Sequence, residues 1–160
     1  MKKAITILTV ALLVVLVVLS VGCGGKSTTE TTNSNEKNES SRSKRDLQRV
    51  QGIIENGADV NQGHEPFNQT MLHDAAYNGY TESAAYLIDH GANLEARDKN
   101  VQTPLHLAVN GHSTETAALL LDRGADVNAR DDDNATPLRL ATFFKFQDMV
   151  ELLKARGGVE

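Results

Sequence analysis

The residues of this 160-residue chain that could do chemistry are its five histidines, its one cysteine and a short run of aspartates. His73 and Asp74 are adjacent, as in the paired ligands of a metal-dependent phosphohydrolase. However, no two histidines stand four residues apart on one predicted helix, which is a common zinc-binding spacing. The run Asp131–Asp133 could attract calcium, but it lacks the glycine and the distal glutamate of a calcium loop. Because no hydrolase or nucleotide-binding motif appears either, we predict no catalytic residue, no metal site and no cofactor.

Cys23 offers a different chemistry, because it directly follows an apolar run. Met1-Lys2-Lys3 is basic, Ile5–Val21 is almost wholly apolar, and polar residues begin after Gly25. This is the layout of a secretory signal peptide. The stretch Leu19-Ser20-Val21-Gly22-Cys23 resembles a bacterial lipobox, although Ser20 occupies the position that usually holds leucine. The resemblance implies that residues 1–22 are removed as a signal peptide and that Cys23 carries a lipid.

An uncleaved signal anchor is the alternative, since an apolar run of 17 residues is near the lower limit for crossing a bilayer. Both interpretations place the rest of the chain on the extracytoplasmic side of the cell membrane or cell envelope. Residues 23–45 are rich in Ser, Thr, Asn, Glu and Lys and contain no large apolar residue. Such a segment cannot bury enough surface to offset chain entropy, so we predict a disordered polar tether.

The remainder of the chain repeats with a period of 33 residues. Thr70, Thr103 and Thr136 keep this spacing, and so do three leucines, three alanines and three glycines. Thr103 is a good helix N-cap, and Pro104 suits the first helical position, where the missing N–H costs nothing. Each unit is therefore predicted to contain two short helices joined by a turn.

Period and motif together resemble the ankyrin repeat, whose T-P-L-H-x-A signature is found at Thr103–Ala108. The GADVN exit motif occurs at Gly57–Asn61 and again at Gly124–Asn128. The resemblance covers about residues 46–157 and implies an all-α repeat solenoid with β-hairpin-like loops. The ankyrin repeat domain, 46–160, divides into a half repeat (46–65) and three repeats (66–98, 99–131 and 132–160). The resemblance also implies that His73 and His106 stabilise the hairpins.

One glycine departs from the period. Gly111 follows Thr103 by eight residues, whereas Gly79 follows Thr70 by nine. The spacing predicts that the turn between the two helices of the second repeat is shifted by one residue.

Two hairpin loops also contain unusual residues. Val101 stands where the other units have Asn68 and Asn134, and valine does not tolerate the left-handed conformation that asparagine accepts. Either this loop has another shape, or Val101 is exposed. The first loop is one residue longer than the others and contains Phe67, which either lies exposed at the loop tip or folds back over the half repeat.

The last unit contains Phe143, Phe144 and Phe146, which either seal the end of the core or form an apolar surface patch. We expect one or two of the three rings to seal the core, and not all of them.

The overall composition limits the classes of function that this chain could have. A chain that is 40% hydrophobic but only 4% aromatic suits a solenoid, in which small aliphatic residues are buried between units. The net charge is −5, and an acidic chain with no basic stripe argues against a nucleic-acid partner. Since no enzyme site is predicted, we expect a monomeric module that binds another protein as a scaffold or adaptor. The alternative is an inhibitor or immunity-type lipoprotein that blocks a toxin or hydrolase, and a purely structural role would require no partner.

The ankyrin resemblance implies a binding surface made of the hairpin tips and the groove along the first helices. Exposed aromatic residues are typical anchors at such surfaces. The candidate partner-binding residues are Phe67, Tyr77, Asn78, Lys99, Asn100, Gln102, Asp132, Asp133, Phe143 and Phe144. In the second repeat the matching groove positions are expected around Val109 and Asn110. With acidic residues at the tips, a basic or amphiphilic protein is the expected partner.

Overall fold

The computed structural model describes residues 33–160, and the chain from Asn35 onward forms one compact unit. The predicted signal peptide, Cys23 and the first part of the predicted tether lie outside the described residues. Within residues 33–160, no helix combines the length and the apolar character needed to cross a membrane.

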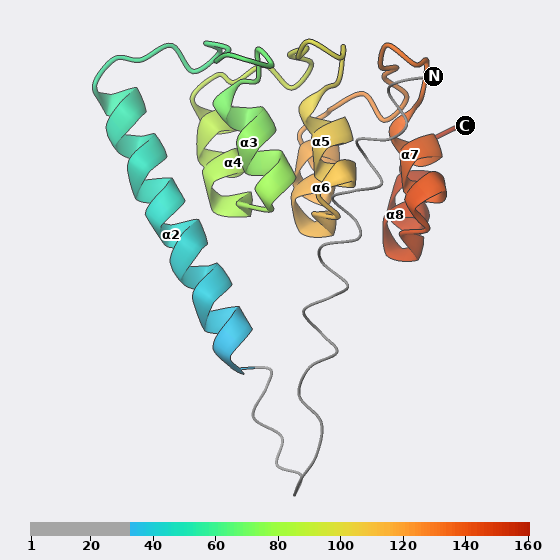
Figure 1. The fold of residues 1–160 in the computed structure, drawn as a ribbon, viewed down its shortest axis with the longest axis horizontal. Helices are drawn as coiled ribbons and strands as arrows, with labels where there is room; N and C mark the ends of the chain where they lie inside the picture. Colours follow the sequence, from blue (N-terminus) through green and yellow to red (C-terminus); the bar gives the residue numbers. More distant parts are fainter. Residues whose placement is uncertain (1–32) are drawn as a thin grey trace, which may run out of the picture. The chain divides into compact units, whose positions relative to one another are not determined.

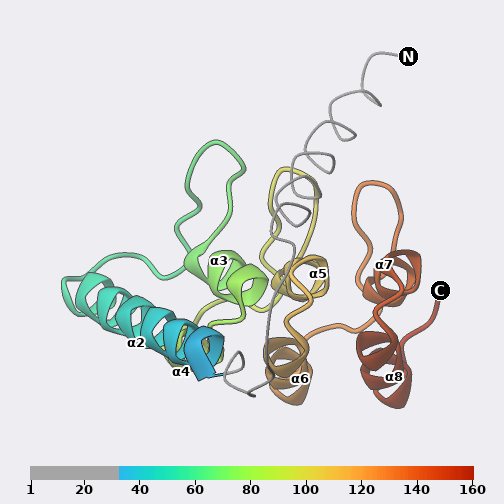
Figure 2. The ribbon, with the colours of Figure 1, turned by 60° about the horizontal axis from the view of Figure 1, so that its bottom comes forward.

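The described chain is built from α-helices in pairs. The long helix α2 (Asn33–Glu55) precedes three pairs: α3 (Met71–Asn78) with α4 (Thr81–Asp89), α5 (Pro104–Asn110) with α6 (Thr114–Asp122), and α7 (Pro137–Phe144) with α8 (Gln147–Ala155). Figure 2 shows α3, α5 and α7 in one row and α4, α6 and α8 in a second row. Long loops enter the first helix of each pair at the top of Figure 1, and short turns join the two helices at the opposite end. This is the predicted α repeat solenoid.

The repeated motif explains where the inner helices α3, α5 and α7 begin and what they bury. Pro104 and Pro137 occupy the first helical position, as predicted. Leu72, Leu105 and Leu138, spaced by 33 residues, are all within 2% of complete burial. Small alanines on the same helices let neighbouring helices approach closely. The core therefore runs from repeat to repeat as a continuous layer of leucine and alanine.

Successive repeats are also joined through the exit loops. Asn61 donates from Nδ2 to the Gly91 carbonyl, and its Oδ1 accepts from the backbone of Asn93. Asn128, about two periods further along the chain, makes the same two contacts with Gly157 and Val159. The asparagine of the GADVN motif is thus a connector between units.

The hairpin loop at Val101 does not have another shape. Asn68, Val101 and Asn134 all have a left-handed backbone, with φ of 55°, 58° and 58°. The Val101 side chain is 42% exposed. The prediction of an exposed Val101 is therefore confirmed, and this β-branched residue is held in a conformation that it rarely adopts.

The prediction of a shifted turn in the second repeat was wrong. The left-handed residues of the three turns are Gly79, His112 and Lys145, which keep the period of 33. Gly111 has φ of −83°, so the glycine is displaced while the turn keeps its place. Sequence alone located the turn by its glycine, and here the left-handed residue is a histidine.

Helix α2 extends much further toward the N-terminus than predicted. We expected a disordered tether over residues 23–45, yet residues 33–45 are helical. Val50 is buried in the core and Ile54 packs against it, which fixes the C-terminal half of the helix. Once a helix is nucleated, each further residue that is fixed adds one hydrogen bond, whereas the first turn fixes three residues for one bond. The polar segment therefore continues a helix that is held by the apolar half.

Candidate protein-binding surface

Exposed aromatic side chains gather at the turn ends of the inner helices. Tyr77, in the last turn of α3, is 51% exposed, and Phe143 and Phe144, in the last turn of α7, are 77% and 42% exposed. Asn78, beside Tyr77, is also exposed. Burying a large aromatic side chain is worth roughly 1.5–3 kcal/mol. Because these three side chains stay exposed, that free energy of burial remains available for a contact with another molecule.

In the second repeat the equivalent positions are not Val109 and Asn110. Val109 is completely buried, and the left-handed His112 fixes the register one residue later. Asn110 and Gly111 therefore correspond to Tyr77–Asn78 and Phe143–Phe144. Both are half-buried and neither is aromatic, so the exposed aromatic residues stand at the two ends of this surface.

The three turns are tied to one another by direct contacts. The Ser113 hydroxyl donates to the Tyr77 carbonyl oxygen at 3.2 Å. His112 Nε2 lies 2.8 Å from Asp148 Oδ1, and the Thr114 hydroxyl donates to Asp148 Oδ2 at 2.7 Å. These hydrogen bonds, that from the His112 side chain foremost, lower the pKa of Asp148 to about 2. The turns thus form a connected strip from the first to the last full repeat.

The three phenylalanines divide between core and surface. Phe146 packs against the core, whereas Phe143 and Phe144 are exposed. Their rings are in contact in sequence: Phe143 with Phe144 at 5.4 Å between centroids, and Phe144 with Phe146 at 5.5 Å. The expectation that not all three seal the core is confirmed.

The hairpin tips form a second candidate region, at the other end of the inner helices. Phe67 is 54% exposed, so it lies at the surface of its loop and is not folded away. Lys99, Asn100, Asp132 and Asp133 are exposed as well. Gln102 is half-buried. Its side-chain oxygen accepts from Asn110 Nδ2, and its backbone carbonyl faces His73 Nε2. The tips are not uniformly acidic, since Lys99 Nζ lies 2.7 Å from Glu65 Oε2 and forms an ion pair with it.

A buried aspartate and backbone contacts hold the tips in place. Asp98 is 5% exposed, and its Oδ1 accepts from the backbone of Asn100 and of Gln102. Lys99 donates its backbone N–H to the Phe67 carbonyl, and Asp132 donates to the Asn100 carbonyl. Neighbouring tips are therefore hydrogen-bonded to each other. They form a hydrogen-bonded edge at the N-terminal ends of the inner helices.

His73 and His106 have the structural role that the repeat motif implied. His73 Nδ1 lies 3.1 Å from the donating backbone N–H of Thr70, and its Nε2 is 3.1 Å from the Gln102 carbonyl of the next repeat. His106 repeats this arrangement with Thr103 and the Ala135 carbonyl. Only the neutral imidazole with its proton on Nε2 satisfies both contacts. Burial lowers the pKa of each histidine below its ordinary 6.5, which favours that neutral form.

No group of three metal-ligating side chains occurs among residues 33–160. His90 binds the Tyr86 carbonyl at the end of α4 through Nδ1, as expected for a histidine at a helix terminus. His64 pairs with Asp74 at 2.8 Å on the exposed side of the first loop. The histidines within this range thus have protein partners.

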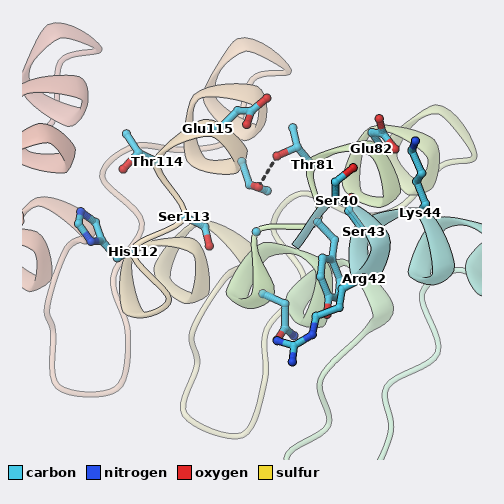
Figure 3. A pocket seen from close by; sticks show the side chains of 14 residues that line it. Ser40, Arg42, Ser43, Lys44, Thr81, Glu82, His112, Ser113, Thr114 and Glu115 are labelled. Atoms are coloured by element: carbon cyan, nitrogen blue, oxygen red, sulfur yellow. Dashed lines mark hydrogen bonds between the residues drawn. The ribbon is translucent and has the colours of Figure 1, made fainter. Parts of the chain in front are cut away.

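A cleft of about 630 Å³ lies between α2 and the turns that begin α4 and α6. Figure 3 shows Arg42 and Lys44 on one side and His112 on the other. Glu82 and Glu115 also line it, so its charges are mixed. The cleft contains none of the candidate groove residues except Asn78.

The fold and the repeated contacts agree with the family comparison, in which a model of ankyrin repeats in three copies matches residues 40–131 and 98–160. The chain belongs to the ankyrin repeat family. Over 55 residues this ankyrin-repeat chain is 38% identical to the 2-5A-dependent ribonuclease of Mus musculus. That match covers 34% of this chain and 8% of the ribonuclease, so the chain spans a small part of that relative.

Sequence reasoning found the exposed aromatic ends of this surface but missed the contacts of His112 with Phe146 and Asp148. The period of 33 places His112 at the position of Gly79, which could have indicated a left-handed histidine. Its partner Asp148 carries no motif and stands on another repeat. Only the packing of adjacent repeats brings these side chains together.

Proposed function

We propose that this chain is an ankyrin-repeat module that binds a partner protein as a scaffold or adaptor. Ankyrin repeats in general mediate protein–protein contacts, and the chain is proposed to have no enzymatic activity of its own. The observation that carries this proposal is the exposure of Tyr77, Phe143 and Phe144 at the turn ends of the inner helices. Interface hot spots are enriched in such aromatic anchors.

A crosslinking pull-down from detergent-solubilised native membranes tests this proposal. The bait is the intact chain, and the test variant carries Tyr77→Ser, Phe143→Ser and Phe144→Ser. Val159→Ser is the matched control, because Val159 is a similarly exposed apolar residue whose contacts with Asn128 and Thr136 use only its backbone. Helical circular dichroism is compared first, so that unfolding is not mistaken for lost binding.

A discrete protein recovered by the intact chain and the control, and not by the triple variant, supports the aromatic surface. Equal recovery by all three chains would move the site to the hairpin tips, which a Phe67→Ser variant then tests. Recovery of no discrete protein would contradict the binding function. The nature of a recovered protein also separates a scaffold from an inhibitor of a toxin or hydrolase.

We also propose that Cys23 carries a lipid that tethers the module to the extracytoplasmic side of the cell membrane or envelope. The support is the order of basic residues, apolar run and cysteine at the N-terminus. Metabolic labelling with a fatty-acid analogue, followed by mass spectrometry of the N-terminus, tests this tether. A Cys23→Ser variant should lose the label, and an unlabelled chain that keeps residues 1–22 would indicate the signal anchor instead.

A further inference from the structure

His112 has a strained backbone at the centre of the strip of turns. Its φ is 52°, at the position where the first turn has Gly79 with φ of 71°. A non-glycine residue in the left-handed region is energetically unfavourable and persists only where its surroundings fix it. The contacts of the His112 side chain must therefore offset the unfavourable backbone conformation.

Two contacts join this side chain to the following repeat. His112 Nε2 lies 2.8 Å from Asp148 Oδ1, and the imidazole stacks on the ring of Phe146 with 3.9 Å between centroids and 4° between planes. Asp148 is held from its other oxygen by the Thr114 hydroxyl. The imidazole is thus fixed at its edge by a carboxylate and on its face by an aromatic ring.

Phe146 is the first of three rings in contact. It stacks on Phe144, and Phe144 meets Phe143 edge to face. Phe146 is half-buried, whereas Phe143 has the largest exposed fraction among the large apolar side chains of the described residues. A continuous row of rings therefore runs from His112 to the outermost candidate anchor.

We propose that His112 is a positioning residue for the partner-binding surface, holding Phe146 and, through it, the rings of Phe144 and Phe143. The inference rests on the proposed binding function and adds a residue to it. Preorganised side chains lose less conformational entropy when a partner binds, which raises affinity without a new contact. A left-handed histidine at this position is then the means of fixing the aromatic anchors.

Fluorine NMR of the full chain labelled with 4-fluorophenylalanine tests the proposal without a partner. The chain has four phenylalanines, and single Phe→Tyr variants assign the signals. The test variant is His112→Gly, which removes the imidazole and also relieves the backbone. Lys145→Gly is the matched control, because Lys145 has φ of 63° at the equivalent position of the next turn.

In His112→Gly, the signals of Phe146 and Phe144 should move toward that of a freely rotating ring, while that of Phe67 stays in place. Unchanged Phe146 and Phe144 signals in His112→Gly, or equal changes in Lys145→Gly, would overturn the positioning role.

The pull-down described above then separates the two proposals. If the rings respond to His112→Gly and no chain recovers a partner, the positioning role stands and the binding function fails. If the native chain recovers a partner, His112→Gly should recover several-fold less of it than Lys145→Gly. Equal recovery by these two variants would show that the position of the rings does not serve binding.

Discussion

The backbone carbonyl of Tyr77 lies against the α-carbon of Gly111 in the next repeat. A β-carbon added at Gly111 would overlap the Tyr77 carbonyl oxygen and stand 2.8 Å from its carbonyl carbon. That carbonyl also accepts a hydrogen bond from the Ser113 hydroxyl. The absence of a side chain at Gly111 therefore allows the first two turns to pack directly, backbone against backbone.

Gly111→Ala should destabilise the fold by about 1–3 kcal/mol, the usual cost of forcing extra atoms into a close-packed contact. Gly52→Ala is the matched control, since nothing lies within 4 Å of a β-carbon at that helical position. Alanine is the better helix former by about 1 kcal/mol, so this variant should be stabilised. Urea unfolding measures both changes, and a Gly111→Ala midpoint at or above that of the native chain would contradict the packing argument.

The same residues show how much of the fold and of the candidate site the sequence can predict. The period of 33 places helices, caps and core correctly, because Thr, Pro, Leu and Ala act within one unit. It does not predict why the second-repeat glycine stands at 111, because the reason is the carbonyl of Tyr77, 34 residues earlier in the chain. The contact between His112 and Asp148 was missed for the same reason. Contacts between repeats depend on stacking geometry, which no single repeat encodes.

Replacing Val101 should raise stability. Valine at φ of 58° is strained, and the side chain is exposed, so little packing is lost on its removal. Val101→Gly should stabilise the fold by about 1 kcal/mol. Asn134→Gly is the control at the equivalent position, where asparagine already tolerates the conformation and the gain should be only a few tenths of a kcal/mol. Thermal unfolding of the two variants compares them, and equal gains would argue against strain at Val101.

Stability should fall in mild acid because of His73 and His106. Both have a pKa below the ordinary 6.5 in the folded chain, so between these values the unfolded chain binds more protons. The contribution of the two histidines to the free energy of unfolding is then fully present above pH 6.5 and is lost as the pH falls toward their pKa in the folded chain. Urea midpoints measured between about pH 7.5 and pH 5 should show this decrease.

His106→Gln should make the decrease smaller, although the variant starts from a lower stability. His90→Gln removes a histidine from the exposed end of α4 and serves as the control. The slope of stability against pH should change in the first variant and stay as in the native chain in the second. Identical slopes for both variants would mean that the buried histidine does not carry the effect.

The two halves of α2 should differ in stability. Residues 40–45 are exposed or half-buried, whereas Val50 is 5% exposed and joins the core. A helix that is polar all round gains little from packing. Ser43→Pro should therefore reduce helical circular dichroism and leave the urea midpoint almost unchanged. Gln51→Pro, within the packed half, should lower the free energy of unfolding by about 3 kcal/mol and so lower the urea midpoint.

Hydrogen exchange of the native chain should likewise show amides of residues 35–45 exchanging much faster than those of residues 50–55. Equal protection across α2 would show that its polar half is held by contacts as strong as those of Val50.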